Sequence, residues 1–257
     1  MDYSNYLLKR LGLYFYLDQK SLLFLSKSFS KIFDSKRKIT QKESMKILSI
    51  LKNKKRKRRI DSFENEMNMI KNFILESKIS YGNMIDYGGG SSPLCEEIKK
   101  MGFEKTAIVD YKAKEFINIE TFEKDEKDKI KFCPVIHPDD FIKLKDNSLN
   151  LVTAIYLLHH IPSGLRLKIL QNIYDKLRVH GILIIKEHDY NYDNNFYNFL
   201  ELYHELWYIL NNEERDILNL VSKKDLEMTL FGIGFKKIKE DKFEKSLQRI
   251  YFSVFQK

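Results

Sequence analysis

The feature that most constrains this chain is a run of three glycines at residues 88–90, directly after the short segment MIDY at residues 84–87. Glycine has high conformational entropy in the unfolded chain and contributes no side-chain packing, so three in a row need a reason. At a turn between a strand and a helix, bare backbone lets a ligand approach closely, and the first N–H groups of the helix can bind it. We therefore predict a strand ending near residue 87, a ligand-binding turn, and a helix over residues 94–101.

Segments with the pattern of strands alternate with segments of helical periodicity along the rest of the chain. The strand-like segments cover residues 83–87, 106–110, 131–136, 149–158, 181–188, 235–240 and 249–255. Such alternation predicts a mostly parallel sheet with helices on both faces. The expected fold class is α/β, a Rossmann-like sheet of seven mostly parallel strands.

An acidic residue ends the strand that follows the glycine turn. Asp110 lies 22 residues after Gly88, a place from which a carboxylate can accept hydrogen bonds from both hydroxyls of a ribose. The turn lacks the lysine of a phosphate-gripping loop. The pattern therefore favours a ribose-bearing ligand other than a nucleoside triphosphate.

These residues resemble the first motif of the class I S-adenosylmethionine (SAM)-dependent methyltransferases, which is an acid-x-Gly-x-Gly turn. Asp86, Gly88 and Gly90 match that motif, and Asp110 matches the family's ribose-binding acid. The resemblance extends over about residues 63–257. It implies SAM as the cofactor and says little about the molecule that accepts the methyl group.

The same resemblance implies a site for the adenine. Residues 138–152, PDDFIKLKDNSLNLV, look like the family's third-strand acid with the loop and strand that follow it. Either Asp139 or Asp140 would then accept a hydrogen bond from the adenine amine. We favour Asp140, because Phe141 after it could stack on the purine. Tyr156, in the segment that matches the end of the fourth strand, completes the expected cofactor site.

Three short motifs in the second half of the chain resemble a narrower group of methyltransferases. LLHHIP at residues 157–162, IIKEHD at 184–189 and LYHELWYIL at 202–210 together resemble methyltransferases encoded by large DNA viruses of eukaryotes. Those proteins are commonly supposed to act on RNA caps. The likeness implies an RNA acceptor, a protein partner in a capping or RNA-processing complex, and a place in the host cytoplasm or the virion.

Titratable side chains gather where the fourth and fifth strands are expected to end. His160, Glu187 and His188 are the candidate catalytic residues, because the carboxyl ends of parallel strands form the edge at which such folds bind ligands. His159 precedes His160, and one of the two can face the acceptor while the other shapes the loop.

Two alternatives concern the segment after the fifth strand. A metal site could use His188, Asp189, His204 and Glu205, but no second histidine follows His204 at i+4, so we expect no metal. The aromatic residues of 203–208 form either a core stripe or a lid over the acceptor.

Basic residues concentrate in the first third of the chain. Residues 1–80 hold 19 Lys and Arg against 8 Asp and Glu, whereas the whole chain has a formal net charge of +9. Residues 52–59, KNKKRKRR, supply much of this excess, and such a run either contacts phosphates or serves as a solvated linker. The residues expected to bind RNA are Lys54, Lys55, Arg56, Lys57, Arg58 and Arg59.

The basic run also divides the chain. Before it, residues 4–17, 21–33 and 40–51 have the periodicity of short helices, and Thr40 with Glu43 makes a capping-box pattern. We expect a basic helical N-terminal region at residues 1–60 and a methyltransferase domain at 61–257. Two cysteines are too few for a disulfide framework, and no apolar segment is long enough for a membrane span. An intracellular, cytoplasmic protein is therefore expected.

The expected fourth strand disfavours several acceptors. It has no Asn-Pro-Pro-Tyr word for adenine amines, no Pro-Cys nucleophile for cytosine C5, and no acid for the Lys-Asp-Lys-Glu set of ribose 2′-oxygen enzymes. Guanine N7 of an mRNA cap remains by elimination, because it needs no base. A small-molecule or protein acceptor survives equally. So does a non-catalytic subunit that binds SAM or RNA and stimulates a partner enzyme.

Overall fold

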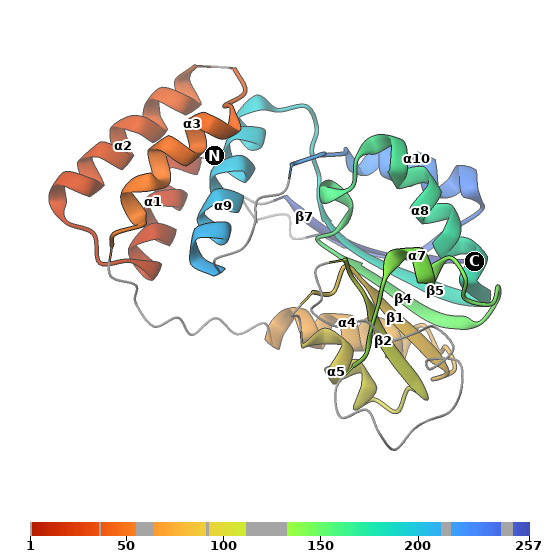
Figure 1. The fold of residues 1–257 in the computed structure, drawn as a ribbon. Coiled ribbons are helices and arrows are strands. Elements are labelled where there is room, and N and C mark those ends of the chain that lie inside the picture. The colour runs from red at the N-terminus through yellow and green to blue at the C-terminus, as the bar shows by residue number, and fades with distance from the viewer. Residues whose placement is uncertain are drawn as a thin grey trace. The chain divides into compact units, whose positions relative to one another are not determined.

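The structure of the protein is a computed structural model. The contacts between residues divide the chain into two units (Figure 1). The described residues are 2–35, 37–54, 64–90, 93–111, 133–211, 217–242 and 249–257. One unit, the helical unit, takes those of Met1–Ser62 and Tyr190–Leu218 together with Arg249. The other, the sheet unit, takes the remainder. Each unit is thus built from segments that are distant in the sequence.

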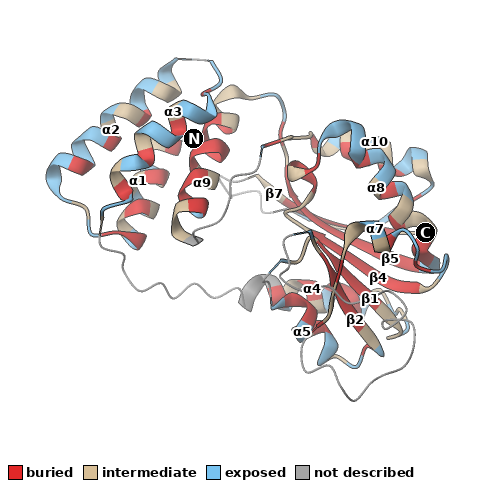
Figure 2. Cartoon of the chain, in the orientation of Figure 1, coloured by how far each residue is buried: buried red, intermediate tan, exposed pale blue. Residues whose placement is uncertain are grey.

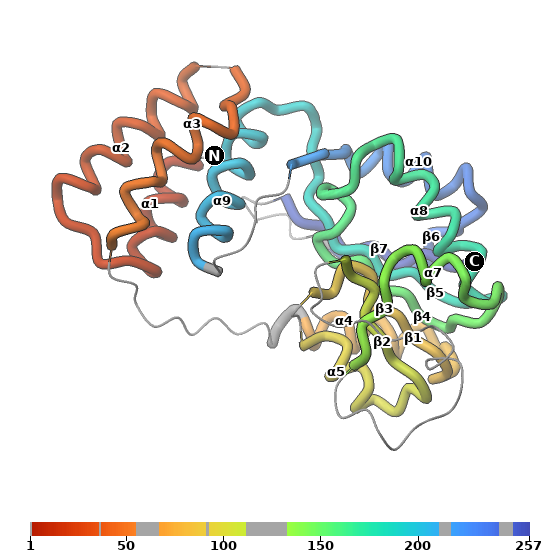
Figure 3. The backbone as a smooth tube through the Cα atoms, in the orientation of Figure 1, coloured from red at the N-terminus to blue at the C-terminus, as the bar shows by residue number. Residues whose placement is uncertain are grey.

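A sheet of seven strands forms the centre of the sheet unit. The strands are β1 (Asn83–Tyr87), β2 (Lys105–Val109), β3 (Val135–Ile136), β4 (Leu149–Ile155), β5 (Leu177–His188), β6 (Lys236–Lys242) and β7 (Ile250–Gln256). Their order across the sheet is β3-β2-β1-β4-β5-β7-β6 (Figure 3). Only β7 runs antiparallel to its neighbours β5 and β6, and the other pairs are parallel. The predicted fold class is confirmed.

Helices cover both faces of this sheet (Figure 1). They are α4 (Glu64–Glu76), α5 (Leu94–Lys99), α7 (Pro138–Phe141), the 3-10 turn η2 (Leu158–His160), α8 (Ser163–Lys176) and α10 (Lys223–Ile233). Leu170 of α8 and Leu230 of α10 belong to one buried cluster with the strands. Ile70 of α4 and Ile98 of α5 belong to a second cluster, on the other face. The sheet is therefore buried on both sides (Figure 2).

Burial on both sides explains the continuous apolar run in β5. Ile182, Leu183, Ile184 and Ile185 are all fully buried. Leu183 and Ile185 pack in the first cluster, whereas Ile182 and Ile184 pack in the second. Successive side chains of a strand point to opposite faces, so a strand covered on both sides has no polar face to alternate with.

The start of β5 differs from the sequence prediction. The predicted strand covers residues 181–188, but residues 177–180 are also part of it. The backbone of Lys257 explains this, because its N–H donates to the Gly181 carbonyl (3.0 Å) and its carbonyl accepts from His180 (3.4 Å). The first residues of β5 depart from regular strand geometry. His180 has a φ of 65°, and the pairing of β5 with β4 shifts register between Leu149 and Leu151.

The helical unit contains four α-helices in its described residues. They are α1 (Tyr3–Tyr14), α2 (Gln19–Asp34), α3 (Gln41–Leu48), followed by the 3-10 turn η1 (Ser49–Leu51), and α9 (Asn194–Asn211). The Thr40 hydroxyl accepts from the Glu43 N–H, and the Glu43 carboxylate accepts from the Thr40 N–H. The predicted capping box is confirmed, and it begins α3 by satisfying N–H groups that no helical carbonyl reaches.

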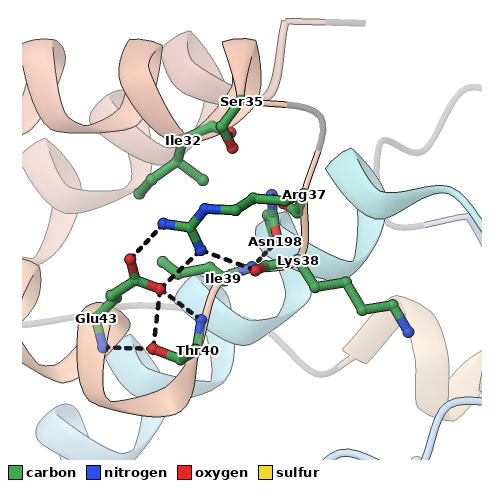
Figure 4. A network of polar contacts seen from close by, with 8 residues as sticks. All are labelled: Ile32, Ser35, Arg37, Lys38, Ile39, Thr40, Glu43 and Asn198. Atoms are coloured by element: carbon green, nitrogen blue, oxygen red, sulfur yellow. Dashed lines mark hydrogen bonds and ion pairs between the residues drawn. The ribbon is translucent and has the colours of Figure 1, made fainter.

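Helix α9 joins the three N-terminal helices through apolar and polar contacts. The ring of Phe199 stacks on Tyr3 of α1 at 5.0 Å between centroids. Asn198, which is fully buried, accepts from the Ile39 N–H (2.6 Å) and donates to the Arg37 carbonyl (2.8 Å). Figure 4 shows these residues beside the capping box. A single amide thus fixes the chain just before α3 to a helix that comes much later in the sequence. Among the described helices, none is long and apolar enough to cross a membrane.

Candidate active site

The order of the strands locates the site. The chain moves outward from β1 to β2 and β3 on one side, and from β4 to β5 on the other. β1 and β4 are adjacent, with Asp86 opposite Thr153 in their register. In open α/β sheets, ligands bind outside the carboxyl ends of the strands at the place where the order reverses. The glycine turn follows β1 at this place, and the predicted catalytic residues follow β4 and end β5.

The first two glycines of the turn have no room for side chains. Gly88 has a φ of +77°, and a Cβ on it would lie 2.4 Å from Cδ1 of Leu157. Its N–H donates to the Val109 carbonyl at the end of β2 (2.7 Å). A Cβ on Gly89 would lie 2.4 Å from Oδ2 of Asp86. The first two glycines are therefore required by packing, which answers why the backbone is bare here.

Asp86 lies beneath this turn and is 1% exposed. Its Oδ1 accepts a hydrogen bond from the Thr153 hydroxyl (2.6 Å), while its buried Oδ2 has no hydrogen-bond partner among the described residues. Burial raises the pKa of Asp86 to about 6, although the Thr153 hydroxyl opposes the shift. An acceptor that is buried without a donor is costly, so the site suits a ligand that brings a donor or a positive charge.

Asp110 follows β2 and contacts the third glycine. Its Oδ2 accepts from the Gly90 N–H (3.0 Å), and its own N–H donates to the Ile136 carbonyl (3.2 Å). Gly90 has a φ of +52°, which is strained for most other residues. The acid expected to bind a ribose is therefore brought to the glycine turn by the pairing of β1, β2 and β3.

The predicted adenine-binding residues separate into core and surface. Phe141 at the end of α7 is fully buried, and its ring packs edge-on against Tyr87 at 5.0 Å. It has no exposed face on which a purine could stack, so the structure gives it a packing role. Asp140 is half-buried and pairs with Lys143 (2.6 Å), whereas the side chain of Asp139 is 84% exposed.

Tyr156 connects the ends of β4 and β5. Its φ of 53° is unusual for a tyrosine, and its N–H donates to the Lys186 carbonyl (2.8 Å). Its ring stacks on His188 at 5.0 Å between centroids, and the Lys186 ammonium lies 4.1 Å from the ring centre. The fully buried Lys186 thus contacts an aromatic face. A constrained backbone of this kind is typical of a functional site.

Glu187 and His159 form the best-defined contact at this edge. Nδ1 of His159 lies 2.5 Å from Oε1 of Glu187, and both side chains are at most 1% exposed. The His188 N–H donates to Oε1 (2.8 Å) and the His159 N–H donates to Oε2 (3.2 Å). The ring of His160 lies 4.1 Å from that of His159. The three predicted catalytic residues, His160, Glu187 and His188, are therefore brought together around His159.

Sequence reasoning gave no role to Thr153 or Lys186 at this edge, and it left His159 with two alternatives, facing the acceptor or shaping the loop. The Thr153 hydroxyl donates a hydrogen bond to Asp86 from the adjacent strand. The Lys186 ammonium contacts the ring face of Tyr156, and His159 pairs with Glu187. Lys186 had a signal in the sequence, because it interrupts an otherwise apolar strand. Thr153 had none, since its meaning depends on the register of β1 against β4.

Comparison with known proteins bears on this arrangement. A family model described as a methyltransferase domain matches residues 54–240. The chain belongs to this methyltransferase family. No curated protein sequence matches it significantly.

Solved structures of low sequence identity share the fold of this methyltransferase. A SAM-dependent methyltransferase from Archaeoglobus fulgidus is 18% identical, with a TM-score of 0.50, and the match covers 76% of this chain and 95% of that one. The PH0226 protein from Pyrococcus horikoshii OT3 is 15% identical, with a TM-score of 0.52 over 77% of this chain and 92% of that one. These likenesses concern the fold.

The cofactor of the methyltransferase is SAM, and the glycine turn fits it. SAM carries an ammonium and a sulfonium group, either of which would offset the charge of Asp86, whose Oδ2 has no hydrogen-bond partner in the described part of the chain. Because Gly88 and Gly89 have no side chains, SAM can approach the backbone of the turn closely. Asp110 has the carboxylate that two ribose hydroxyls need. The role of each residue in binding SAM stays a prediction.

Metal ligation is disfavoured by the contacts of the candidate ligands. The Asp189 Oδ1 accepts from the Lys223 N–H (2.9 Å), and a ring nitrogen of His204 lies 2.8 Å from the Leu200 carbonyl. Among described residues of the sheet unit, His159, Glu187 and His188 have potential ligand atoms within 4.8 Å of one another.

The basic run is described only at its start. Lys55, Arg56, Lys57, Arg58 and Arg59 lie outside the described residues. Lys54 forms an ion pair with Asp18, whose pKa is lowered chiefly by this contact. The Lys54 ammonium therefore has a protein partner in addition to any ligand.

Proposed function

We propose that this methyltransferase transfers the methyl group of SAM to RNA. The observation that carries the proposal is the basic excess of residues 1–80, 19 Lys and Arg against 8 Asp and Glu. In the described part of this region, Lys42 and Lys46 are exposed one turn apart on α3, and Lys52 is exposed before the basic run. Cations spaced along one face suit a chain of phosphates.

The sheet unit has the parts that a transfer reaction needs. SAM supplies an activated methyl group when it is bound. The task of the chain is to hold the methyl donor and the acceptor in line. Asp110 and the glycine turn would orient the nucleoside, and Asp140 would accept from the adenine amine. His160, Glu187 and His188 lie at the ends of β4 and β5, where the acceptor would enter.

The acceptor within RNA follows from elimination and from resemblance. Guanine N7 of a cap needs no base, and it is the position that the sequence of the fourth strand leaves. Residues 157–162 and 184–189 resemble methyltransferases of large DNA viruses, which are commonly supposed to act on caps. A protein partner in a capping or RNA-processing complex belongs to the same proposal.

A small molecule is the second candidate acceptor. The buried and aromatic surroundings of Tyr156 and His188 support it, because small-molecule sites are mostly apolar with a few polar groups. A subunit that binds SAM or RNA and stimulates a partner enzyme is a third reading. It would bind both ligands without any transfer.

Transfer of tritiated methyl from SAM tests these readings directly. The substrates are RNA with an unmethylated guanosine cap, uncapped RNA of the same sequence, and the small-molecule fraction of a cell extract. We expect label in RNA. Label only in the small-molecule fraction would favour the second candidate, and no label anywhere, with both ligands bound, would favour the third. Asp110→Ala serves as the control for SAM dependence.

Charge variants test whether the basic run contacts RNA. Lys55, Arg56, Lys57 and Arg58 are replaced by Ser, while Lys54 is kept because it pairs with Asp18. For single strands the slope of log K against log salt is about −0.7 per phosphate contact, so the loss of three contacts should flatten it by about 2. The matched control replaces four exposed lysines of the sheet unit, namely Lys145, Lys168, Lys224 and Lys236. An equal slope in the parent and in the first variant would refute RNA contact by the run.

A further inference from the structure

The guanidinium of Arg166, on α8, binds three backbone carbonyls. Its Nε donates to the Leu158 carbonyl (3.1 Å), and its Nη2 donates to the carbonyls of Ile161 (3.0 Å) and Asn219. Arg166 is 8% exposed. A guanidinium carries five donors in a fixed plane, so one side chain can satisfy several carbonyls at once. Arg166 therefore ties the turn that follows β4 to the segment that precedes α10.

Asn219 completes this support of η2. Its N–H donates to the His159 carbonyl (2.6 Å), and its side-chain amide donates to the His160 carbonyl (3.5 Å). Each of the four carbonyls of residues 158–161 thus accepts a hydrogen bond from Arg166 or Asn219. A single 3-10 turn has few hydrogen bonds of its own, so the position of η2 depends on these outside contacts.

A second buried charge holds η2 from β5. Glu187 is fully buried, and its Oε2 accepts from the His159 N–H (3.2 Å). Burial lowers the pKa of Arg166, and the charges of Glu187 and Tyr251 oppose that shift. A buried charge is costly unless it is paired and hydrogen-bonded. The cost of burying both charges beside one short turn indicates that the exact position of η2 matters to the molecule.

Leu157 connects η2 to the glycine turn. It directly precedes η2, and a Cβ on Gly88 would lie 2.4 Å from its Cδ1 and 3.1 Å from its Cγ. The leucine therefore occupies the space that a side chain at position 88 would take. Glycine has more conformational freedom than any other residue, so contacts of this kind are what restrict the turn to one form.

We propose that Arg166 is a positioning residue for SAM and that it acts through Leu157. By fixing residues 158–161, it holds the leucine against Gly88 and keeps the glycine turn in the conformation that accepts the cofactor. A binding site that already has its bound conformation loses less entropy when the ligand arrives. The proposal rests on the glycine turn as the cofactor site and is independent of the acceptor.

Two other roles for Arg166 make different predictions. If it only stabilises the fold, its loss should lower the melting temperature and leave the SAM affinity of the folded protein unchanged. If it acts only by its charge near Glu187, a lysine should serve as well. An ammonium is a compact point charge, however, and lacks the planar fork with which a guanidinium reaches three carbonyls. Arg166→Lys therefore separates the charge from the hydrogen-bonding geometry.

Calorimetry with SAM on Arg166→Lys is the first test. Affinity should fall about tenfold, which is the order of magnitude by which residues in one network affect each other. Arg178→Lys, at an exposed position of β5, is the matched control and should keep the parental affinity. Circular dichroism establishes that each variant is folded at the temperature of the measurement. Parental affinity in folded Arg166→Lys protein would overturn the proposal.

A double-mutant cycle tests the route through Leu157. Leu157→Ala should weaken SAM binding by a similar factor, although it removes no hydrogen bond of Arg166. Because both substitutions release the same contact with Gly88, the double variant should bind SAM about as well as Leu157→Ala alone. Leu165→Ala, at an exposed position of α8, is the control and should not change the affinity. Parental affinity in Leu157→Ala, or losses that multiply in the double variant, would show that the route does not exist.

Rescue by guanidinium separates positioning from stability. In Arg166→Ala, guanidinium ion well below its denaturing concentration should restore SAM affinity toward the parental value, whereas methylammonium, which has no planar fork, should not. Arg178→Ala in the same solutions corrects for effects of the salt. A restored melting temperature without restored affinity would mean a role in stability only, and the proposal would fail. If neither Arg166 variant folds, Leu157→Ala still decides, because it leaves Arg166 in place.

Binding of SAM needs no acceptor, so these results are independent of the RNA proposal. If tritiated methyl appears only in a small molecule, the RNA proposal fails, and calorimetry still decides the role of Arg166. If Arg166→Lys and Leu157→Ala bind SAM as the parent does while RNA is labelled, this inference fails and the RNA proposal stands. Intact SAM binding in Gly88→Val would remove the glycine turn from the cofactor site, and the inference with it.

Discussion

Two contacts hold the chain in different ways. One is the glycine turn of the sheet unit. The other is the Asn198 joint of the helical unit, by which we mean the hydrogen bonds of Asn198 to residues 37 and 39. At the turn, Gly90 and the Asp110 that contacts it are 20 residues apart. At the joint, Asn198 binds backbone groups 159 and 161 residues away. The turn is a local motif with a ligand-binding form. The joint is a remote contact whose task is to unite two segments.

The largest effect on stability is expected for a substitution in the glycine turn, compared with the same kind of substitution at an unconstrained glycine. Gly88→Val should destabilise the protein by roughly 2–6 kcal/mol, because it combines a strained backbone, at about 1–3 kcal/mol, with overpacking against Leu157, at about 1–3 kcal/mol. Urea unfolding measures the loss, and calorimetry should find no SAM binding. Gly164→Ala is the control, since nothing lies within 4 Å of a Cβ there. Intact SAM binding in Gly88→Val would remove the turn from the cofactor site.

A smaller effect is expected at the joint. Asn198→Ala leaves the buried Ile39 N–H without a partner, at about 1–3 kcal/mol, and removes a hydrogen bond from the part-buried Arg37 carbonyl, at about 0.5–1.5 kcal/mol, so we expect a loss of roughly 1.5–4.5 kcal/mol. Affinity for SAM should not change, and this contrast distinguishes the joint from the turn. Lys42→Ala, at an exposed position of α3, is the control. A variant as stable as the parent would show that the amide does not join the segments.

The buried acid beneath the turn predicts a pH dependence. Burial raises the pKa of Asp86 to about 6 in the folded protein, from 3.8 ordinarily. Between these values the folded state binds more protons than the unfolded state, so stability should fall as pH rises from 4 to 6. Relative to Asp86→Asn, the parent should lose about 1–3 kcal/mol over this interval. Chemical denaturation at several pH values checks this. Asp241→Asn, an exposed acid of β6, should leave the parental curve in place.

The smallest effect concerns the capping box next to the joint. Thr40→Ala should cost about 1 kcal/mol, as is usual for a helix cap. Arg37, whose guanidinium pairs with Glu43 at 2.5 Å, is largely exposed, and Arg37→Ala should give no measurable change in the urea midpoint. If Arg37→Ala costs as much as Thr40→Ala, the ion pair rather than the cap begins α3.

The sequence predicts the turn well because its parts lie at strand ends that are close in the chain. Asp86, Gly88 and Asp110 are separated by one helix, and parallel pairing of β1 with β2 brings them together. Burial of Phe141 was not predicted, because an aromatic residue beside an acid reads equally as a stacking partner or as core. The Glu187–His159 contact was not predicted either, since the direction of each side chain depends on how β5 pairs with β4 and β7.

The joint illustrates why remote contacts are harder to predict. The periodicity of α1–α3 predicts helices with apolar stripes, but a stripe does not name the surface that covers it. The segment of α9 reads as part of the methyltransferase domain by its position in the sequence. The contacts group it with the N-terminal helices. In the sequence, nothing distinguishes Asn198 from any other asparagine of a helix, so its burial could not be predicted.

The joint between α3 and α9 also affects synthesis of the protein. The end of α3 and the start of α9, Leu48 and Asn194, are 146 positions apart. At about 5–20 residues per second, roughly 7–30 s pass between their translation. During that interval Tyr3 lacks the ring of Phe199 that stacks on it. The nascent helices therefore expose apolar surface to the cell while the whole parallel sheet is being made, and a chaperone that holds them would improve the yield of folded enzyme.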